Sequence, residues 1–315
     1  MKKSPIISLI MPCYNSADYI VATVNGVFKQ SFSDFELIII NDGSSDSSLE
    51  YLQQLSNRYP KLRYFSQTNQ GAGAARNYGI SEAQGEFIAF LDADDSLHPD
   101  CLKLLYQQFQ QQSDIAIAYC GWQNKGLKEN RCQPYIPPDY EQTNKLETLL
   151  RTCPWPIHAA LTRRNIIEEN GGFNEALSSS MDYDLWLRIA SKYPISRVNA
   201  VLAYYHHHDG EQITNNHQRI ALNHRAIQQA FLNTHPEIIK QLGHKKVRLL
   251  TDGELLKRAY INYWDRDLLT AHALFRKSLK SLYFSAKDLQ YLLPSLLPYK
   301  LYKHLLLKVD KQRKT

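Results

Sequence analysis

The stretch FIAFLDADD, residues 87–95, places an apolar run of strand length directly before three carboxylates, those of Asp92, Asp94 and Asp95. Like charges this close repel one another unless a positive group lies between them. The stretch ends a series of four short apolar runs, and segments with helical spacing separate the runs. The expected strands are residues 6–11, 35–42, 62–67 and 86–91, and the expected helices are residues 17–30, 45–58, 72–83 and, further along, 145–152. This alternation predicts βαβ units and an α/β fold with a mainly parallel sheet.

Polar side chains gather where three of the expected strands end. The clusters are residues 12–15 after the first strand, 41–46 after the second and 92–95 after the fourth. In parallel sheets, ligands bind beyond the carboxyl ends of the strands. The three carboxylates are therefore expected in a ligand crevice and not on an outer face of the protein.

The composition excludes several classes of protein. Of 315 residues, 43% are hydrophobic and 22% are charged, which is typical of a packed globular protein and not of a disordered chain. No apolar run approaches the roughly 20 residues of a membrane-spanning helix, and the start of the chain has no signal-peptide cleavage site. The five cysteines are scattered without a C-x-x-C pair, so we expect a reduced, cytoplasmic protein. The net charge of +6 is mild and indicates no nucleic-acid partner.

The second half of the chain has a different pattern. Residues 123–140 are polar and rich in proline, which predicts a loop. Apolar residues at helical spacing follow Asp182 and Asp184, so these carboxylates are expected near the start of a helix. From His217 onward the pattern is helical throughout. The expected domains are residues 1–216 and a C-terminal helical region, residues 217–315.

Four segments carry a resemblance to a known family. They are SLIMPCYN (8–15), ELIIINDGSSDSS (36–48), NQGAGAARNYGISEAQGEFIAFLDADD (69–95) and DYDLWLR (182–188). In order and spacing they resemble the family 2 glycosyltransferases, over about residues 5–210. The resemblance implies the GT-A fold, with helices around the sheet in a Rossmann-like arrangement. It also implies an inverting transfer of a sugar from a nucleotide diphosphate, taken here as UDP-linked, to a glycan or lipid-linked acceptor in cell-envelope or capsular polysaccharide synthesis.

The Asp-x-Asp pair is suited to a divalent metal ion. Asp92 and Asp94 point the same way at a strand end, and their hard oxygen atoms select Mn²⁺ or Mg²⁺, which neutralise a diphosphate leaving group. The resemblance implies that Asp94 is the direct ligand and that Asp92 lies on the sugar or ribose side. His208 either completes the metal or diphosphate site or is an ordinary surface histidine. The alternative to a metal site is that Asp94 and Asp95 cap the turn into the next helix, and Asp95 taken alone is expected to be a cap and not a ligand.

A nucleotide site is implied by the same resemblance. Asp42 is expected to accept a hydrogen bond from the base, or else to form a simple turn with Gly43. Arg76, at the start of a helix, is expected to pair with the phosphates, and a surface ion pair is the alternative. The remaining residues of this site are Pro12 and Tyr14, against the base and ribose, and Asn15.

An inverting transfer needs a base that takes the proton of the acceptor hydroxyl. By its position in MDYDLWLR (181–188), Asp182 resembles that base, and the alternative is a helix N-cap. Asp184 is the fallback base. Trp155 and His158 are expected to line the acceptor cleft, and packing is the alternative for Trp155.

Two other functions compete with this interpretation. A sugar-phosphate nucleotidyltransferase needs a Gly-rich, basic loop directly after the first strand, and PCYNSADYI (12–20) is not such a loop. A non-catalytic sugar-nucleotide-binding module has no need of the Asp-x-Asp pair together with Asp182. The catalytic interpretation is therefore preferred.

The C-terminal tail, residues 296–315, combines basic and apolar side chains. It contains Lys300, Lys303, Lys308, Lys311, Arg313 and Lys314, and Leu301, Leu305, Leu306 and Leu307. Such a face suits the anionic inner surface of the plasma membrane, which predicts peripheral contact. The alternative is that the leucines pack onto the catalytic domain while the lysines face water.

Overall fold

The computed structural model of the chain describes residues 4–127, 131–208 and 216–312, the last five of these by backbone alone. The chain forms two compact units. We call them the α/β unit, Met1–Leu149 with Cys153–Gly210, and the helical unit, Leu150–Thr152 with Glu211–Thr315. The two compact units are not a test of the domain boundary expected after residue 216, because that boundary refers to parts that fold independently. It stays a prediction.

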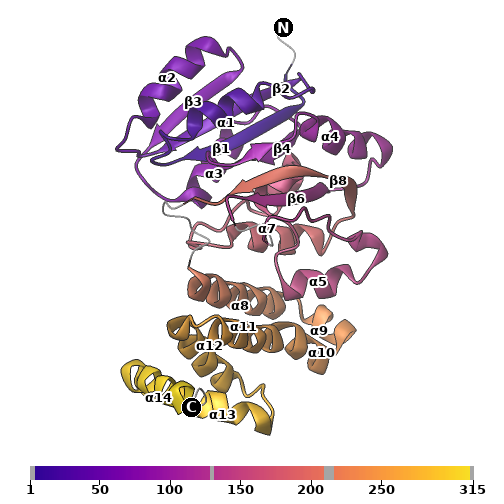
Figure 1. Cartoon of the computed structure of the whole chain (residues 1–315). Helices are drawn as coiled ribbons and strands as arrows, with labels where there is room; N and C mark the ends of the chain where they lie inside the picture. Colours follow the sequence, from indigo (N-terminus) through magenta and orange to yellow (C-terminus); the bar gives the residue numbers. More distant parts are fainter. Residues whose placement is uncertain (1–3, 128–130, 209–215, 313–315) are drawn as a thin grey trace. The chain divides into compact units, whose positions relative to one another are not determined.

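The α/β unit contains an eight-stranded sheet in the order β3-β2-β1-β4-β7-β6-β8-β5 (Figure 1). The strands are β1 Ile7–Cys13, β2 Phe35–Asp42, β3 Leu62–Gln67, β4 Phe87–Phe90, β5 Ser96–Leu97, β6 Ile117–Lys125, β7 Ala160–Arg163 and β8 Ile195–His206. The first four strands pair in parallel, as does β6 with β8, whereas β7 and β5 run antiparallel to their neighbours. The α/β fold with a mainly parallel sheet is therefore confirmed.

The parallel half of the sheet follows from its sequence pattern. Every residue of β2 is buried, which is typical of a parallel strand covered on both faces. Helix α3 packs closely on β1, because a side chain at Gly79 would overlap Ile10. The helices of this half are α1 Ile20–Val27, α2 Ser48–Arg58, α3 Ala72–Glu82 and α4 Cys101–Gln111. β2, β1 and β4 are parallel neighbours, so their C-terminal ends lie next to one another.

The second half of the sheet departs from the expectation at one place. The loop predicted to begin at Gln123 begins later, because β6 continues to Lys125 beside β8. Trp122 also bridges Tyr135 in antiparallel fashion, and their rings lie 4.8 Å apart. The shorter elements are η2 Tyr140–Gln142, α5 Lys145–Arg151, η3 Ile157–Ala159, α6 Arg164–Glu169 and α7 Met181–Ala190. Pairing with a strand about 80 residues away decided the structure of this polar segment.

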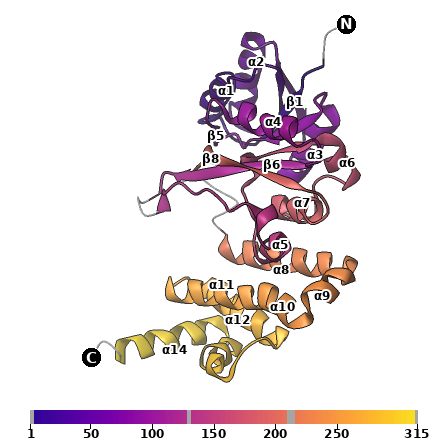
Figure 2. The same ribbon diagram turned by 90° about the vertical axis from the view of Figure 1, so that its right-hand side faces the viewer.

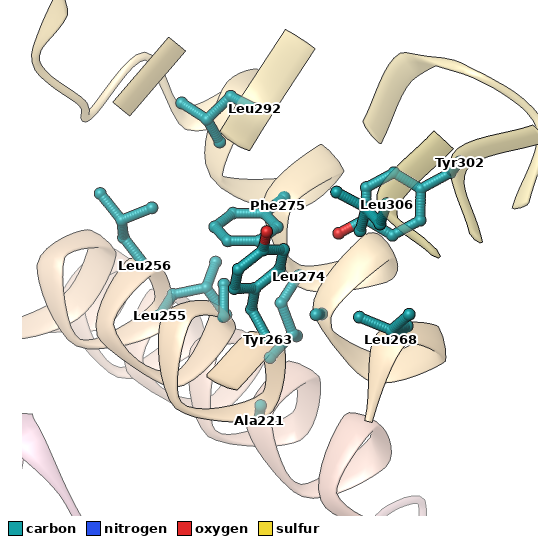
Figure 3. Packing of buried hydrophobic residues seen from close by; sticks show 12 residues of the cluster. Ala221, Leu255, Leu256, Tyr263, Leu268, Leu274, Phe275, Leu292, Tyr302 and Leu306 are labelled. Atoms are coloured by element: carbon teal, nitrogen blue, oxygen red, sulfur yellow. The ribbon is translucent and has the colours of Figure 1, made fainter. Parts of the chain in front are cut away.

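The helical unit has no strand among its described residues, as its pattern predicts (Figure 2). It contains α8 His217–Thr234, α9 Pro236–Leu242, α10 His244–Arg248, the π-helical turn η5 Leu249–Gly253, α11 Glu254–Trp264, α12 Leu268–Ser281, η6 Ala286–Asp288, α13 Leu289–Leu292, η7 Leu293–Leu296 and α14 Tyr299–Gln312. Its core gathers around Phe275 and Leu274 of α12, which are fully buried (Figure 3). Burying such a side chain contributes about 1.5–3 kcal/mol.

Candidate active site

The loop after β1 is fastened to the loop after β2 by side-chain hydrogen bonds. Asn15 adopts a left-handed backbone conformation with φ of 46°. Its Oδ1 accepts a hydrogen bond from the backbone N–H of Ser45 at 2.8 Å, and its own N–H donates to Oγ of Ser44 at 3.0 Å. Pro12 and Cys13 end β1, and Tyr14 is 52% exposed. Asn15 therefore holds the loops after β1 and β2 together, and Tyr14 is accessible to solvent.

Asp42 is the most heavily hydrogen-bonded carboxylate at this edge of the sheet. It is buried at the end of β2. It accepts hydrogen bonds from Nε2 of Gln67 at 2.8 Å and from the N–H groups of Gln70 at 2.9 Å and Gly71 at 2.8 Å. Gly71 has φ of +89° and directly precedes α3. The carboxylate therefore ties β2 to the loop that leads into α3, and it is more than the simple turn that the sequence allowed.

Arg76 of α3 is the positive partner of the carboxylate cluster. Its guanidinium group is buried, lies 5.6 Å from the ring centroid of Phe173, and donates through Nη2 to Oδ1 of Asp92. Its Nε has no hydrogen-bond partner among the described residues. Arg76 is therefore not a surface ion pair, and it retains donor capacity beside Asp92.

Asp94 contacts His208, which lies near the end of the α/β unit in sequence. Its Oδ2 lies 2.9 Å from Nε2 of His208, just beyond the end of β8. The imidazole ring stacks on Tyr19 at a centroid distance of 4.7 Å. Both side chains of the Asp94–His208 pair are only partly exposed. The contact excludes an isolated surface histidine and brings together two residues that are 114 positions apart.

Asp95 is buried and does not cap a helix, so the expected cap is wrong. Its Oδ1 accepts a hydrogen bond from the N–H of His206 at 2.9 Å, and its Oδ2 lies 3.2 Å from Nδ1 of His158. Burial, followed by the charges of Asp92 and Asp94, raises the pKa of Asp95 well above its ordinary value. Burial also lowers the pKa of His158 to about 4. Asp95 thus links the segment after β4 to His206 of β8 and to His158 of η3.

Two residues expected to line the acceptor cleft are buried instead. The side chain of His158 is fully buried, so it cannot line an open cleft. Trp155 is also buried, and its ring stacks on Tyr119 at 4.5 Å with an interplanar angle of 10°. Packing is therefore the correct interpretation for Trp155.

Asp182 lies in the first turn of α7 and interacts electrostatically with Arg76 and Asp92. Its Oδ1 accepts the N–H of Tyr183 at 2.8 Å, and Sγ of Cys153 lies 3.8 Å from its Oδ2. Burial raises the pKa of Asp182, the charge of Arg76 lowers it, and the charge of Asp92 raises it. A half-buried carboxylate with a raised pKa is a stronger proton acceptor than an exposed aspartate.

Asp184, the fallback base, has a different environment. Its Oδ2 pairs with Nη2 of Arg188 at 2.7 Å, one turn along α7. Arg188 also donates to the carbonyl oxygens of Asn170 and Gly172. Arg188 thus joins Asp184 to the loop after α6, and the carboxylate of Asp184 is occupied by this ion pair.

Sequence reasoning missed three features of the site. Tyr19 and Cys153 contact His208 and Asp182, but no local pattern marks either of them. Ser180, directly before α7, has φ of 61° and sets the start of the helix that carries Asp182. The left-handed conformation of Ser180 could not be foreseen, because serine is not a residue that favours it.

The residues present fit a divalent ion only in part. No group of three or more His, Cys, Asp or Glu side chains in the described parts of the chain is arranged to hold a metal. Asp94 and His208 supply one oxygen and one nitrogen 2.9 Å apart. Mg²⁺ is commonly bound by one or two carboxylates together with substrate phosphates. The pair therefore fits an ion whose other ligands come from a bound diphosphate and water.

The sequence comparisons agree on one family. The model of "Glycosyl transferase family 2" matches residues 8–171. A chondroitin synthase of Escherichia coli is 32% identical over 202 residues, which cover 64% of this chain and 29% of that protein. An uncharacterized glycosyltransferase of Rickettsia conorii is 33% identical over 254 residues, which cover 76% of this chain and 40% of that protein. The chain thus spans less than half the length of these curated relatives.

Two solved structures share the fold over nearly the whole chain. TarS 1–349 of S. aureus in complex with UDP-GlcNAc has a TM-score of 0.59 at 19% identity, covering 95% of this chain and 91% of that one. Mannosyltransferase PcManGT from Pyrobaculum calidifontis, in complex with GDP-Man and Mn²⁺, has a TM-score of 0.61 at 19% identity, covering 96% and 84%. At these identities the likeness establishes the GT-A fold alone.

Proposed function

Because the chain belongs to glycosyl transferase family 2, we propose that it transfers a sugar, with inversion, from a UDP-linked donor to a hydroxyl group of a glycan or lipid-linked acceptor. That it is a glycosyltransferase follows from the family. One observation supports the finer statement: Asp92, Asp94 and Asp182 meet Arg76 and His208 at one edge of the sheet. This edge has the groups that a nucleotide-sugar transfer needs.

The donor would be held along the carboxyl ends of β1, β2 and β4. The exposed ring of Tyr14 would stack on the base, with Pro12 beneath it and Asn15 holding the loop. Asp42 would accept a hydrogen bond from the base with whatever acceptor capacity its three protein donors leave. Arg76 and Asp92 would meet the phosphates and the sugar or ribose hydroxyls. The donors in the titles of similar structures, UDP-GlcNAc and GDP-Man, belong to those proteins.

Asp94 and His208 would hold Mn²⁺ or Mg²⁺. The ion, when bound, neutralises the charge that develops on the diphosphate. His208 would reach the ion by exchanging its present contact with Asp94, and the stacked ring of Tyr19 would keep the imidazole at the crevice. The complex of PcManGT with Mn²⁺ is consistent with this assignment.

Asp182 would act as the general base. The acceptor oxygen forms a bond to the anomeric carbon while its proton passes to the Asp182 carboxylate. The bond from that carbon to the diphosphate oxygen breaks, and its electron pair stays with the diphosphate. Because the attack comes from the face opposite the leaving group, the anomeric configuration inverts. The raised pKa of Asp182 favours its role as proton acceptor.

The setting that we propose is polysaccharide synthesis at the inner face of the plasma membrane. Leu301 and Leu305 of α14 are 57% and 41% exposed beside exposed Lys300 and Lys303, which suits an anionic surface. Tyr302 is buried in the core of the helical unit, as is Leu306. The side chains of residues 308–312 and all of residues 313–315 lie outside the described residues. Within the described parts of the chain, no helix combines the length and apolar character needed to cross a bilayer.

Thermal shift and calorimetry with nucleotide sugars test the donor site. We expect UDP and UDP-sugars to raise the melting temperature more than GDP does, and more with Mn²⁺ than with a chelator. A transfer assay with the best donor and a panel of glycans then tests the reaction. If no nucleotide diphosphate binds, or if binding is insensitive to Mn²⁺, the donor and metal assignments are wrong.

A further inference from the structure

A groove in the helical unit is lined by cations and is separate from the proposed donor site. It consists of two adjoining hollows, one of about 460 Å³ between α8 and α12 and one of about 260 Å³ that Asp252 of η5 and Leu255 of α11 also line. We call it the cationic groove. Gln229 of α8 and Lys277 and Lys280 of α12 line both hollows. Arg276 lines the larger hollow and Arg225 the smaller one.

The helical periodicity of α12 produces the cationic wall. Ala273, Arg276, Lys277 and Lys280 follow one another at spacings of three, one and three residues, so they form a single stripe. On the facing helix α8, Ala226 lines the larger hollow. The two alanines leave room between the helices, because larger side chains at these positions would fill the hollow.

The cations of this stripe have no neutralising partner in the described parts of the chain. Arg276, Lys277 and Lys280 are exposed, and no ion pair joins them to any carboxylate of the described residues. The single carboxylate that lines the groove, Asp252, is already paired with Arg225 at 2.7 Å. Like charges four residues apart on a helix destabilise it, so the fold gains nothing from this arrangement.

The net charge of residues 211–315 also favours an anionic ligand. Residues 211–315 carry 19 Lys and Arg against 8 Asp and Glu, whereas residues 1–210 carry 18 against 23. The net charge is thus positive in the C-terminal third of the chain and negative in the rest. A surface of one sign attracts a polymer of the opposite sign over distances of about a Debye length.

We propose that the cationic groove binds a segment of an anionic glycan, the acceptor chain, through carboxylate or phosphodiester groups. The proposal rests on the proposed function, because it supplies the class of acceptor. A concave surface with exposed cations of α12 along one wall fits a polyanion. A flat bilayer is a poorer fit, since exposed apolar residues such as Leu293 and Leu296 do not line the groove. Nor does any Phe, Tyr or Trp among its described lining residues offer a stacking surface for nucleic acid.

Binding of defined polymers to the full chain tests the groove. The groove variant is Arg276→Gln/Lys277→Gln/Lys280→Gln, and the matched control with the same loss of charge is Lys240→Gln/Lys245→Gln/Lys287→Gln, at exposed positions of the same unit. The fluorescently labelled probes are a polyuronate oligosaccharide, a poly(glycerol phosphate) and neutral dextran. Single-stranded DNA and anionic phospholipid vesicles are measured alongside. The two acidic glycans separate carboxylate from phosphodiester recognition.

We expect at least one acidic glycan to bind at low salt, dextran not to bind, and the groove variant to lose about tenfold or more in affinity. The control variant should lose less than about twofold. UDP binding and hydrolysis of the donor without acceptor should be the same in all three proteins, so a failed donor site is recognised separately. Equal losses in both variants, or binding of only DNA or vesicles, would overturn the proposal.

Discussion

The two units of this protein treat charge in opposite ways. In the α/β unit, the Arg76 guanidinium group is buried and pairs with Asp92. In the helical unit, Lys277 and Lys280 stand exposed without such a partner among the described residues. The Arg76–Asp92 pair holds its side chains in place beyond the ends of the strands, whereas the lysines of α12 face solvent.

The difference follows from the energetics of charges in and out of water. A buried charge that loses its partner is strongly destabilising, so buried pairs hold their positions and can orient reacting groups. Exposed charges interact weakly and are screened by salt, and only their sum matters. Single substitutions should therefore act sharply in the crevice and gradually on the helical surface, where packing supplies the stability.

The largest expected effect tests whether apolar packing holds the helical unit. Phe275→Ala should lower the free energy of unfolding of that unit by about 3–5 kcal/mol, because it removes a fully buried ring from the core. Urea unfolding followed by circular dichroism measures the change. Leu269→Ala, at a 54% exposed position of the same helix, is the control and should change stability by less than about 0.5 kcal/mol. Similar losses in both variants would contradict the role given to this core.

The second prediction tests whether Asp182 is the general base. Asp182→Asn should leave donor binding nearly unchanged and lower the transfer rate about 100-fold or more, the usual scale for losing a general base. In Asp184→Asn the ion pair with Arg188 is lost, so thermal stability should fall while the folded enzyme stays active. Single-turnover rates and melting temperatures are measured for both. If the rate falls in Asp184→Asn instead, the base lies two residues further along.

A smaller effect concerns the dependence of UDP affinity on a divalent metal ion. Asp94→Ala should abolish the gain in UDP affinity that Mn²⁺ provides, which we expect to be about tenfold, since one protein ligand is lost. Calorimetric titration with Mn²⁺ or a chelator measures the gain. Asp114→Ala removes an exposed carboxylate of the same unit and should keep the full gain. Undiminished metal linkage in Asp94→Ala would remove Asp94 from its role.

The pH dependence of the transfer rate should reflect the burial of Asp182. The base works as the carboxylate, so the rate falls as pH drops below its pKa, by about tenfold per pH unit. Burial raises the pKa of Asp182 above the ordinary 3.8 against the opposing charge of Arg76, and the charge of Asp92 raises it further. The fall should therefore begin at a higher pH than for an exposed aspartate. Rates are measured where circular dichroism shows the protein folded, and a rate that stays constant down to the ordinary pKa would refute a buried base.

The smallest effects should come from the tail, where each lysine contributes about 1 kcal/mol at an anionic membrane. Lys300→Gln/Lys303→Gln should weaken flotation with anionic liposomes, and the binding should fall as salt rises. Deleting residues 296–315 is a poor test, because Tyr302 and Leu306 belong to the core of the helical unit. Leu301→Gln at an exposed position probes the apolar contact instead. Binding that is equal for neutral and anionic liposomes would exclude the electrostatic docking.

Sequence patterns predicted the parallel half of the sheet and failed on parts of the second half. β1 to β4 alternate with amphipathic helices, so local periodicity identifies them. The sequence at the end of β6 is polar and predicts a loop, but the segment forms a strand because it pairs with β8. Asp95 looks like a cap because its partners, His158 and His206, are distant in sequence.

The sequence by itself determined the family, the βαβ alternation, the helical C-terminal region and the positions of Asp92, Asp94 and Asp182 at element ends. These features depend on local periodicity and on motifs within single segments. The tertiary structure decided the partners: Arg76 for Asp92, His208 for Asp94 and His158 for Asp95. It also decided that α8 and α12 enclose a cationic groove. Contacts between residues many positions apart depend on how the elements pack, and no local pattern records that packing.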